Sequence, residues 1–245
     1  MMHGSYHLTV RARRRAGATK KRRSIIAPEQ LQRPDRRADI IVSAEKLFAE
    51  HGYAAVSVRD IATLAGVPLA LVGYYFGKKE ELFGTVFEHR KSYIQERIRL
   101  MGTVDCSSQN RNAVEDLVRA WAAPVITLRA NDSDGIFALL VARTAWDPGP
   151  EATEIIKRFY DPLALTFIDK MAAVLPDCDR NRIIWGYEYA LGALLMYVAD
   201  RRVERLSLGK LISGDPVACE ELVVFLGAGF RALSKIERAV RKRDS

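Results

Sequence analysis

Apolar residues recur at three- and four-residue intervals along most of the chain, a spacing that predicts helices. In residues 34–52, Pro34 and Asp35 mark a helix start and Gly52 fits the position just past the end. The apolar stripe of this segment consists of Ile40, Ile41, Ala44, Leu47 and Phe48. Alternation typical of strands is nowhere sustained and no internal repeat is visible. The pattern therefore predicts an all-α fold.

The rest of the chain continues in the same way. Residues 78–100 are expected to form one long amphipathic helix that carries Leu82, Phe83, Val86 and Phe87 on one side. Further helical segments are expected at 112–130, which Pro124 interrupts, and at 134–147, 150–175, 179–206 and 216–243.

The segment SVRDIATLAGVPLALVGYY predicts two short helices joined by a tight turn. Ser57 and Asp60 have the spacing of a capping box. Gly66 ends the first helix, because such a turn needs a residue that accepts positive φ, and Pro68 begins the second. Ala62, Gly66 and Val72 then supply a small residue at the helix crossing, a glycine at the turn and an apolar anchor. This is the helix-turn-helix pattern.

Residues 40–83 resemble the N-terminal domain of TetR/AcrR-family transcriptional regulators. The resemblance runs from IIVSAEKLFAEHGYAAVSVRDIATLAGV to LVGYYFGKKEELF. The matching residues are Leu47, Phe48, Gly52, Tyr53, Ser57, Arg59, Ile61, Ala62, Ala65, Gly66, Val67, Tyr74, Phe76, Lys79 and Leu82. Beyond this region the chain is similar to the family only in being helical and of suitable length.

The resemblance implies a cytoplasmic homodimer on palindromic double-stranded DNA, with two recognition helices in successive major grooves. It also implies a C-terminal domain that dimerises through its last two long helices and binds a small effector, which usually relieves repression. The expected organisation is a basic tail at 1–33, a helix-turn-helix domain at 34–83, and an effector-binding and dimerisation domain at 84–245.

Several residues are candidates for DNA contact. Ser57, at a helix N-terminus, can serve a phosphate. Arg59 is expected to reach a phosphate or a guanine edge, and the alternative is a solvated helix residue. The resemblance implies phosphate contacts for Lys79 and Tyr74. Lys78 stands where many relatives have serine, so a frayed helix start with an extra phosphate contact is expected. The complete candidate set is Ser57, Arg59, Pro68, Leu69, Ala70, Gly73, Tyr74, Tyr75, Lys78 and Lys79.

The predicted recognition helix has no Arg, Lys, Asn or Gln between 68 and 75 for bidentate base contacts. Leu69, Ala70 and Gly73 are expected to face the groove while Leu71 and Val72 pack inward. Sequence reading would then depend on thymine methyls, tyrosine hydroxyls and DNA shape.

Candidates for the effector pocket are mostly aromatic: Trp121, Phe137, Arg143, Trp146, Tyr160, Phe167 and Tyr189. Most aromatic residues belong to ordinary core. Arg143 interrupts an apolar run, so it could bind an anionic effector, pair with Asp161 or Glu188, or lie exposed at an edge. Small and apolar residues of the last long helices predict the dimer interface: Gly186, Ala190, Ala193, Leu222, Leu226, Gly229 and Phe230.

Charge is uneven along the chain, whose net value is +8. Residues 1–33 hold nine Lys and Arg against the single acid Glu29, whereas the rest carries 29 of each sign. Such a tail should be disordered, and it either binds polyanions or is simply solvated. A non-specific architectural DNA-binding protein that relies on this tail is therefore the alternative function.

Other classes of protein find little support in the sequence. The N-terminus lacks the apolar region of a secretory signal, and no apolar run is long enough for a membrane span. The three cysteines show no CxxC, which fits a reduced compartment with no disulfide framework or zinc site. Hydrolase, metalloprotease and phosphate-loop motifs are missing, so neither an enzyme nor a cofactor is expected.

Overall fold

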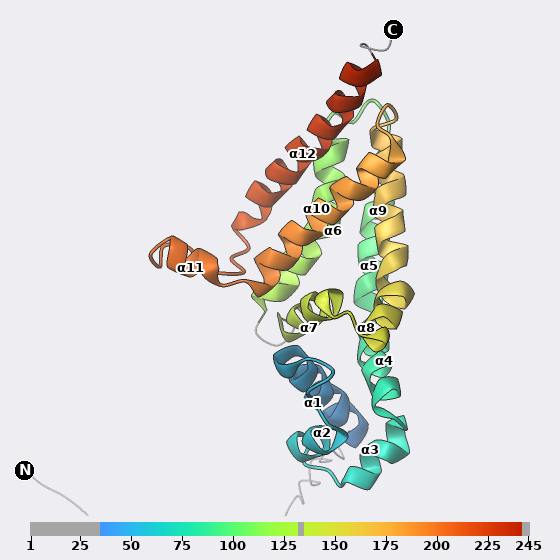
Figure 1. The fold of residues 1–245 in the computed structure, drawn as a ribbon, viewed down its shortest axis with the longest axis vertical. Coiled ribbons are helices and arrows are strands. Elements are labelled where there is room, and N and C mark those ends of the chain that lie inside the picture. The colour runs from blue at the N-terminus through green and yellow to red at the C-terminus, as the bar shows by residue number, and fades with distance from the viewer. Residues whose placement is uncertain (1–34, 132–134, 242–245) are drawn as a thin grey trace, which may run out of the picture. The chain divides into compact units, whose positions relative to one another are not determined.

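The described part of the computed structural model comprises residues 35–131 and 135–241, and all its regular elements are helices (Figure 1). The predicted tail, residues 1–33, lies outside the described residues. The helices are α1 (Arg36–His51), α2 (Val58–Leu64), α3 (Leu69–Phe76), α4 (Lys79–His89), α5 (Lys91–Gly102), α6 (Ala113–Ala130), α7 (Gly135–Trp146), α8 (Pro150–Ile155), α9 (Asp161–Val174), α10 (Arg180–Ala199), α11 (Arg202–Leu206) and α12 (Ala218–Arg241). A π-helical turn, Ile156–Tyr160, joins α8 to α9.

The ends of α1 follow the predicted signals. Asp35 is the N-cap, and its carboxylate accepts hydrogen bonds from the backbone N–H groups of Arg37 and Ala38. Gly52 follows the last residue at φ +83° and donates its N–H to the carbonyl of Phe48. The helix is therefore bounded by a side-chain cap and by a glycine in a conformation that other residues rarely adopt.

The long helix expected at 78–100 is instead two helices, α4 and α5, which meet at Arg90 (φ −97°, ψ 8°). The Arg90 guanidinium binds the carboxylate of Glu45 on α1 at 2.7 and 3.0 Å, and it lies 5.4 Å from the ring centre of Phe137. These contacts hold Arg90 between α1 and α7, and we infer that they fix the change of direction. The domain boundary expected between residues 83 and 84 lies inside α4.

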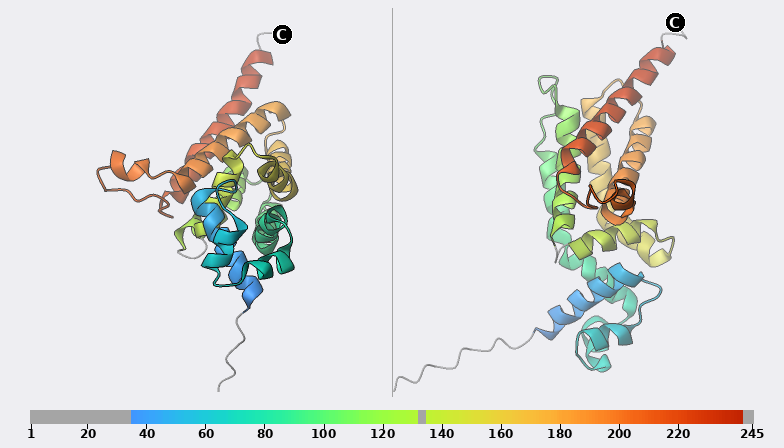
Figure 2. Two further views of the ribbon diagram at one scale, coloured as in Figure 1. Left: turned by 60° about the horizontal axis from the view of Figure 1, so that its bottom comes forward. Right: turned by 90° about the vertical axis from the view of Figure 1, so that its left-hand side faces the viewer.

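Pro124 does not interrupt α6, which continues through it. The larger of two hydrophobic clusters extends from α1 through α4 to the C-terminal helices, and a smaller one lies between α7 and α10. Figures 1 and 2 show α10 beside α12, and α11 standing away from the other helices. No helix of the described segments is long and apolar enough to cross a bilayer.

Candidate DNA-binding surface and effector site

The turn between α2 and α3 is built by local hydrogen bonds. Ser57 and Asp60 form the predicted capping box: Asp60 N–H donates to the Ser57 hydroxyl at 3.2 Å, and Ser57 N–H donates to the Asp60 carboxylate at 2.9 Å. The hydroxyl and backbone hydrogen bonds from Ser57 hold the pKa of Asp60 below its usual range. Gly66 takes φ +64°, and Pro68 is the residue before α3 and not its first residue. The predicted helix-turn-helix geometry is confirmed.

The exposed face of α3 is apolar and aromatic. Val72 and Phe76 are buried, while Leu71 is half-buried and turns away from the core more than expected. Tyr74 is 81% exposed and Tyr75 is 40% exposed, and their rings meet edge to face at 5.4 Å. The remaining predicted contact residues of this segment are all exposed: Pro68, Leu69, Ala70 and Gly73.

Basic groups lie at both ends of this face. Arg59 and Lys78 are exposed, whereas Lys79 is half-buried with its ammonium 4.1 Å from the ring centre of Tyr53. Burial, assisted by Glu80, raises the pKa of Tyr53 to about 12, so the ring beneath Lys79 stays neutral. The start of α4 is better capped than expected, because Glu81 accepts the Lys78 backbone N–H at 3.0 Å.

One further cation lies beside α3 and was not predicted from the sequence. The Arg37 guanidinium lies 5.3 Å from the ring centre of Phe76, so the exposed start of α1 adjoins the end of α3. The only signal available in the sequence was the pair Arg36-Arg37 at the start of a helix.

The predicted effector residues divide between the interior and the surface. Trp121 and Phe167 are buried and pack against each other at 5.3 Å, with Tyr187 beside both. Phe137 is also buried, and the hydroxyl of Tyr160 is enclosed. These four predicted residues, with Tyr187 added, remain candidates for an effector site.

Three of the predicted effector residues lie outside the aromatic interior. Arg143 is exposed, as one of the alternatives for it expected, and it forms no ion pair with a carboxylate of the described residues. It donates to the carbonyls of Ala49 (3.0 Å) and Glu50 (3.2 Å) at the end of α1. Trp146 and Tyr189 are each 63% exposed, because they project from the outer faces of α7 and α10. None of the three belongs to the aromatic interior.

One charged residue that the sequence analysis did not single out lies in that interior. Arg97 on α5 is 4% exposed, and its Nη2 donates to the carbonyl of Trp121 at 2.8 Å. Arg97 occupies the same stripe as the buried Ile94 and Met101. A basic residue at an apolar position of an amphipathic helix was the signal that could have revealed it.

The predicted dimer residues are also corrected in part. Four of them are buried within the subunit: Gly186, Ala190, Leu226 and Phe230. A Cβ on Gly186 would lie 2.6 Å from the Phe230 ring, so the small residue serves close packing of α10 on α12 inside one chain. Ala193 and Leu222 are half-buried and Gly229 is exposed. The exposed apolar face of the two helices carries other residues: Trp185, Tyr189, Val224 and Phe225.

Comparison with models of known protein families shows to which family the chain belongs. A family model described as bacterial regulatory proteins of the tetR family matches residues 40–86. A second, described as the tetracyclin repressor-like C-terminal domain, matches residues 119–229. The chain belongs to the TetR family. Its helix-turn-helix and its C-terminal helical domain are both of the kinds found in these regulators.

Among curated relatives, the HTH-type transcriptional repressor Rv3405c of Mycobacterium tuberculosis is 48% identical over 52 residues. That alignment covers 21% of this TetR-family chain and 28% of the relative, so it spans little more than a quarter of the relative's length. The HTH-type transcriptional dual regulator CecR of Shigella flexneri is 24% identical over 180 residues, covering 69% of this chain and 78% of CecR.

Solved structures show the same fold at low identity. The fatty acid degradation regulator FadR from Bacillus halodurans aligns with a TM-score of 0.57 and 17% identity, over 82% of this chain and 98% of FadR. The ketosteroid transcriptional regulator KstR2 of Mycobacterium tuberculosis aligns with a TM-score of 0.56 and 17% identity, over 81% and 96% of the two chains.

Proposed function

We propose that this chain is a ligand-responsive transcriptional repressor that binds a palindromic operator as a homodimer and leaves it when a small effector binds. The observation that carries the proposal is α3: an eight-residue helix whose exposed face stands clear of the core at the second position of a helix-turn-helix. Arg59, Lys78 and Lys79 flank that face with positive charge, which suits two strands of phosphates on either side of a groove.

Sequence recognition by α3 would be unusual in its chemistry. Leu69, Ala70 and Tyr74 can contact thymine methyl groups, and the tyrosine hydroxyls can donate to base edges or phosphates. Bidentate contacts to guanine or adenine, worth about 1–3 kcal/mol each, would have to come from outside the helix. Specificity within a half-site would therefore be modest and would depend on DNA shape.

Dimerisation would place two such helices on one duplex. The exposed side chains of α10 and α12 support a four-helix interface, because Trp185 (61% exposed) and Phe225 (70% exposed) form an apolar face that a single chain leaves in water. An effector would bind among the C-terminal helices, where the aromatic interior adjoins α4 through Phe87.

Selection of duplexes from a random pool by the full chain tests the proposal. We expect enrichment of an inverted repeat with half-sites about one helical turn apart, and at least about tenfold tighter binding to it than to a scrambled duplex. The same preference should survive removal of residues 1–33. Equal binding to every duplex, lost with the tail, would contradict it and favour a non-specific architectural protein.

A further inference from the structure

The environment of Arg97 is the feature of this molecule that its fold alone does not explain. The side chain is 4% exposed, and no carboxylate of the described segments forms an ion pair with it. Its Nε has no hydrogen-bond partner in the described residues, where its one hydrogen bond goes from Nη2 to the neutral carbonyl of Trp121. A buried guanidinium without a counter-charge is strongly unfavourable, so this arrangement is expected to persist only for a use.

Two phenol groups share this interior and also lack partners within the described residues: the hydroxyls of Tyr93 and Tyr160. The Arg97 guanidinium lies 5.9 Å from the ring centre of Tyr93, and it acts electrostatically on Tyr160. Burial raises the pKa of both phenols above the ordinary value, so both remain hydroxyl donors. Tyr160 belongs to the π-helical turn, an irregularity found frequently at functional sites.

Together these groups offer several donors and one full positive charge, and apart from the Trp121 carbonyl the described residues offer them no acceptor. Two acids, Asp161 and Glu188, act electrostatically on the neighbouring Tyr187, and both are exposed. We propose that Arg97, with the hydroxyls of Tyr93 and Tyr160, binds the carboxylate of an effector whose remaining body is apolar. This inference rests on the proposed function and names the chemical class of its effector.

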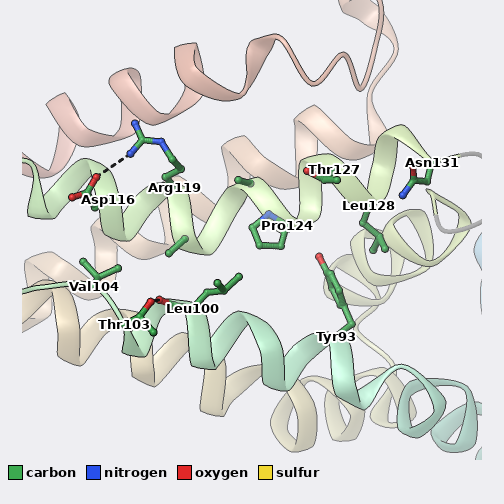
Figure 3. Close-up of a pocket in the computed structure, with 12 residues that line it drawn as sticks. Tyr93, Leu100, Thr103, Val104, Asp116, Arg119, Pro124, Thr127, Leu128 and Asn131 are labelled. Atoms are coloured by element: carbon green, nitrogen blue, oxygen red, sulfur yellow. Dashed lines mark hydrogen bonds and ion pairs between the residues drawn. The ribbon is translucent and has the colours of Figure 1, made fainter.

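A groove next to Arg97 suits the apolar body. On α5, Tyr93 and Leu100 lie one helical turn to either side of Arg97, and both line a groove of about 600 Å³ between α5 and α6. Figure 3 shows them facing Pro124 and Leu128 on α6. Tyr93 belongs to both regions, because its side chain lines the groove while its hydroxyl is among the unpaired donors.

A purely structural role for Arg97 is the competing explanation. Pro124 lacks the N–H that would bond to the carbonyl four residues earlier, and a proline distorts the adjoining turn. Arg97 supports the Trp121 carbonyl in that turn at 2.8 Å. A neutral donor would serve this purpose, however, and Nε stays unpaired. The presence of Pro124 in α6 therefore accounts for one hydrogen bond of Arg97 and not for its charge.

Calorimetric titration of the full chain tests the proposal. The probes are decanoate and phenylacetate, each compared with the alcohol of the same carbon skeleton. We expect the carboxylates to bind once per subunit and the alcohols at least about tenfold more weakly, since a hydrogen-bonded charge pair is lost. Arg97→Met should weaken carboxylate binding by a similar factor, and Arg97→Lys should fall between because it keeps the charge without the planar fork.

Thermal unfolding without ligand distinguishes the two roles of Arg97. Removal of an uncompensated buried charge should leave Tm unchanged or raise it in Arg97→Met, whereas loss of a structural support should lower Tm. Carboxylates that bind wild type and Arg97→Met equally, or fail to bind wild type at all, overturn the proposal. Failure to select any duplex would count against the repressor function alone, because the titration does not involve DNA.

Discussion

At the level of single residues, a substitution of Tyr75 tests the proposal that α3 recognises DNA without amide or guanidinium groups. It is 40% exposed and lies against the ring of Tyr74. We expect Tyr75→Ala to reduce the preference for the selected duplex over a scrambled one by about tenfold, the scale of a single base contact. Fluorescence anisotropy with both duplexes measures the ratio.

Lys78→Ala is the matched control, since Lys78 is exposed and adjoins the same helix. It should weaken binding to both duplexes equally and lower the slope of log affinity against log salt by about one. A preference that falls no further in Tyr75→Ala than in Lys78→Ala would show that Tyr75 serves the phosphates and does not read sequence.

At the level of elements, Arg143 connects α7 to the end of α1. Its guanidinium donates to the carbonyls of Ala49 and Glu50, which have no partner inside α1, and a cation at a helix C-terminus also complements the helix dipole. Arg143→Met should destabilise the chain by about 1 kcal/mol, with a smaller loss in Arg143→Lys. Urea denaturation measures the difference. A urea midpoint for Arg143→Met equal to that of wild type would show that this contact does not contribute to stability.

A second connection between elements gives stability a dependence on pH. Glu115 on α6 accepts hydrogen bonds from Arg231 on α12 at 2.6 and 2.9 Å, and these bonds hold the Glu115 pKa below its usual range. Because the folded pKa is depressed, the stabilisation is fully present above the unfolded value of about 4.3 and is lost as pH falls through the folded pKa. Glu115→Gln should therefore lower Tm at about pH 7 and have little effect at about pH 3.

Glu96→Gln is the control for this pH dependence. Glu96 pairs with Arg99 within α5 and is solvent-exposed, so its substitution should change Tm little at either pH. A Tm difference between wild type and Glu115→Gln that does not shrink on acidification would show that the loss comes from packing and not from the ion pair.

Helix positions and the DNA-binding turn could be predicted from the sequence because their determinants are local. The capping box at Ser57, the positive φ at Gly66 and the apolar anchor Val72 all act within a few residues. The break at Arg90 and the role of Arg143 could not be predicted, because each depends on a partner on α1 that is distant in sequence. The burial of Arg97 among the C-terminal helices could not be predicted for the same reason, because it depends on contacts with α6.

At the level of the whole molecule, a series of aromatic contacts connects the helix-turn-helix to the interior of the C-terminal helices. The ring centre of Phe83 lies 4.8 Å from that of Tyr53 and 5.2 Å from that of Phe87. The ring centre of Phe87 lies 5.7 Å from that of Phe137 and 6.4 Å from that of Tyr160. These contacts connect the residue beneath Lys79 to the surroundings of Arg97 through α4. Phe87→Leu should therefore reduce the fold-change in operator affinity that a carboxylate produces, while operator binding without ligand persists.

Ile126→Val, also buried but outside these ring contacts, is the control for Phe87→Leu. Anisotropy titrations with and without saturating decanoate measure the response of each variant. An unchanged response in Phe87→Leu would mean that α4 moves as a rigid element without needing this ring.

A dimer would bind both half-sites of the proposed operator, whereas a single chain would bind one. Phe225 on α12 is 70% exposed and Trp185 on α10 is 61% exposed. A stable protein–protein interface buries about 1,200–2,000 Å² of accessible surface in total. Phe225→Asp places an unpaired charge at the centre of this face, so we expect monomers by light scattering with helical content unchanged. Affinity for the palindrome should fall by about a hundredfold or more, because the second half-site no longer benefits from linkage to the first.

Leu165→Asp provides the matched comparison, since Leu165 is 52% exposed on α9 and does not belong to the proposed interface helices α10 and α12. It should remain dimeric and bind the palindrome like wild type. The reverse pattern, monomers for Leu165→Asp and dimers for Phe225→Asp, would move the interface to α9 and leave the apolar face of α10 and α12 for another partner. Both variants replace an exposed, large apolar side chain with the same negative charge. A difference between them therefore reports where the interface lies and not a general effect of added charge.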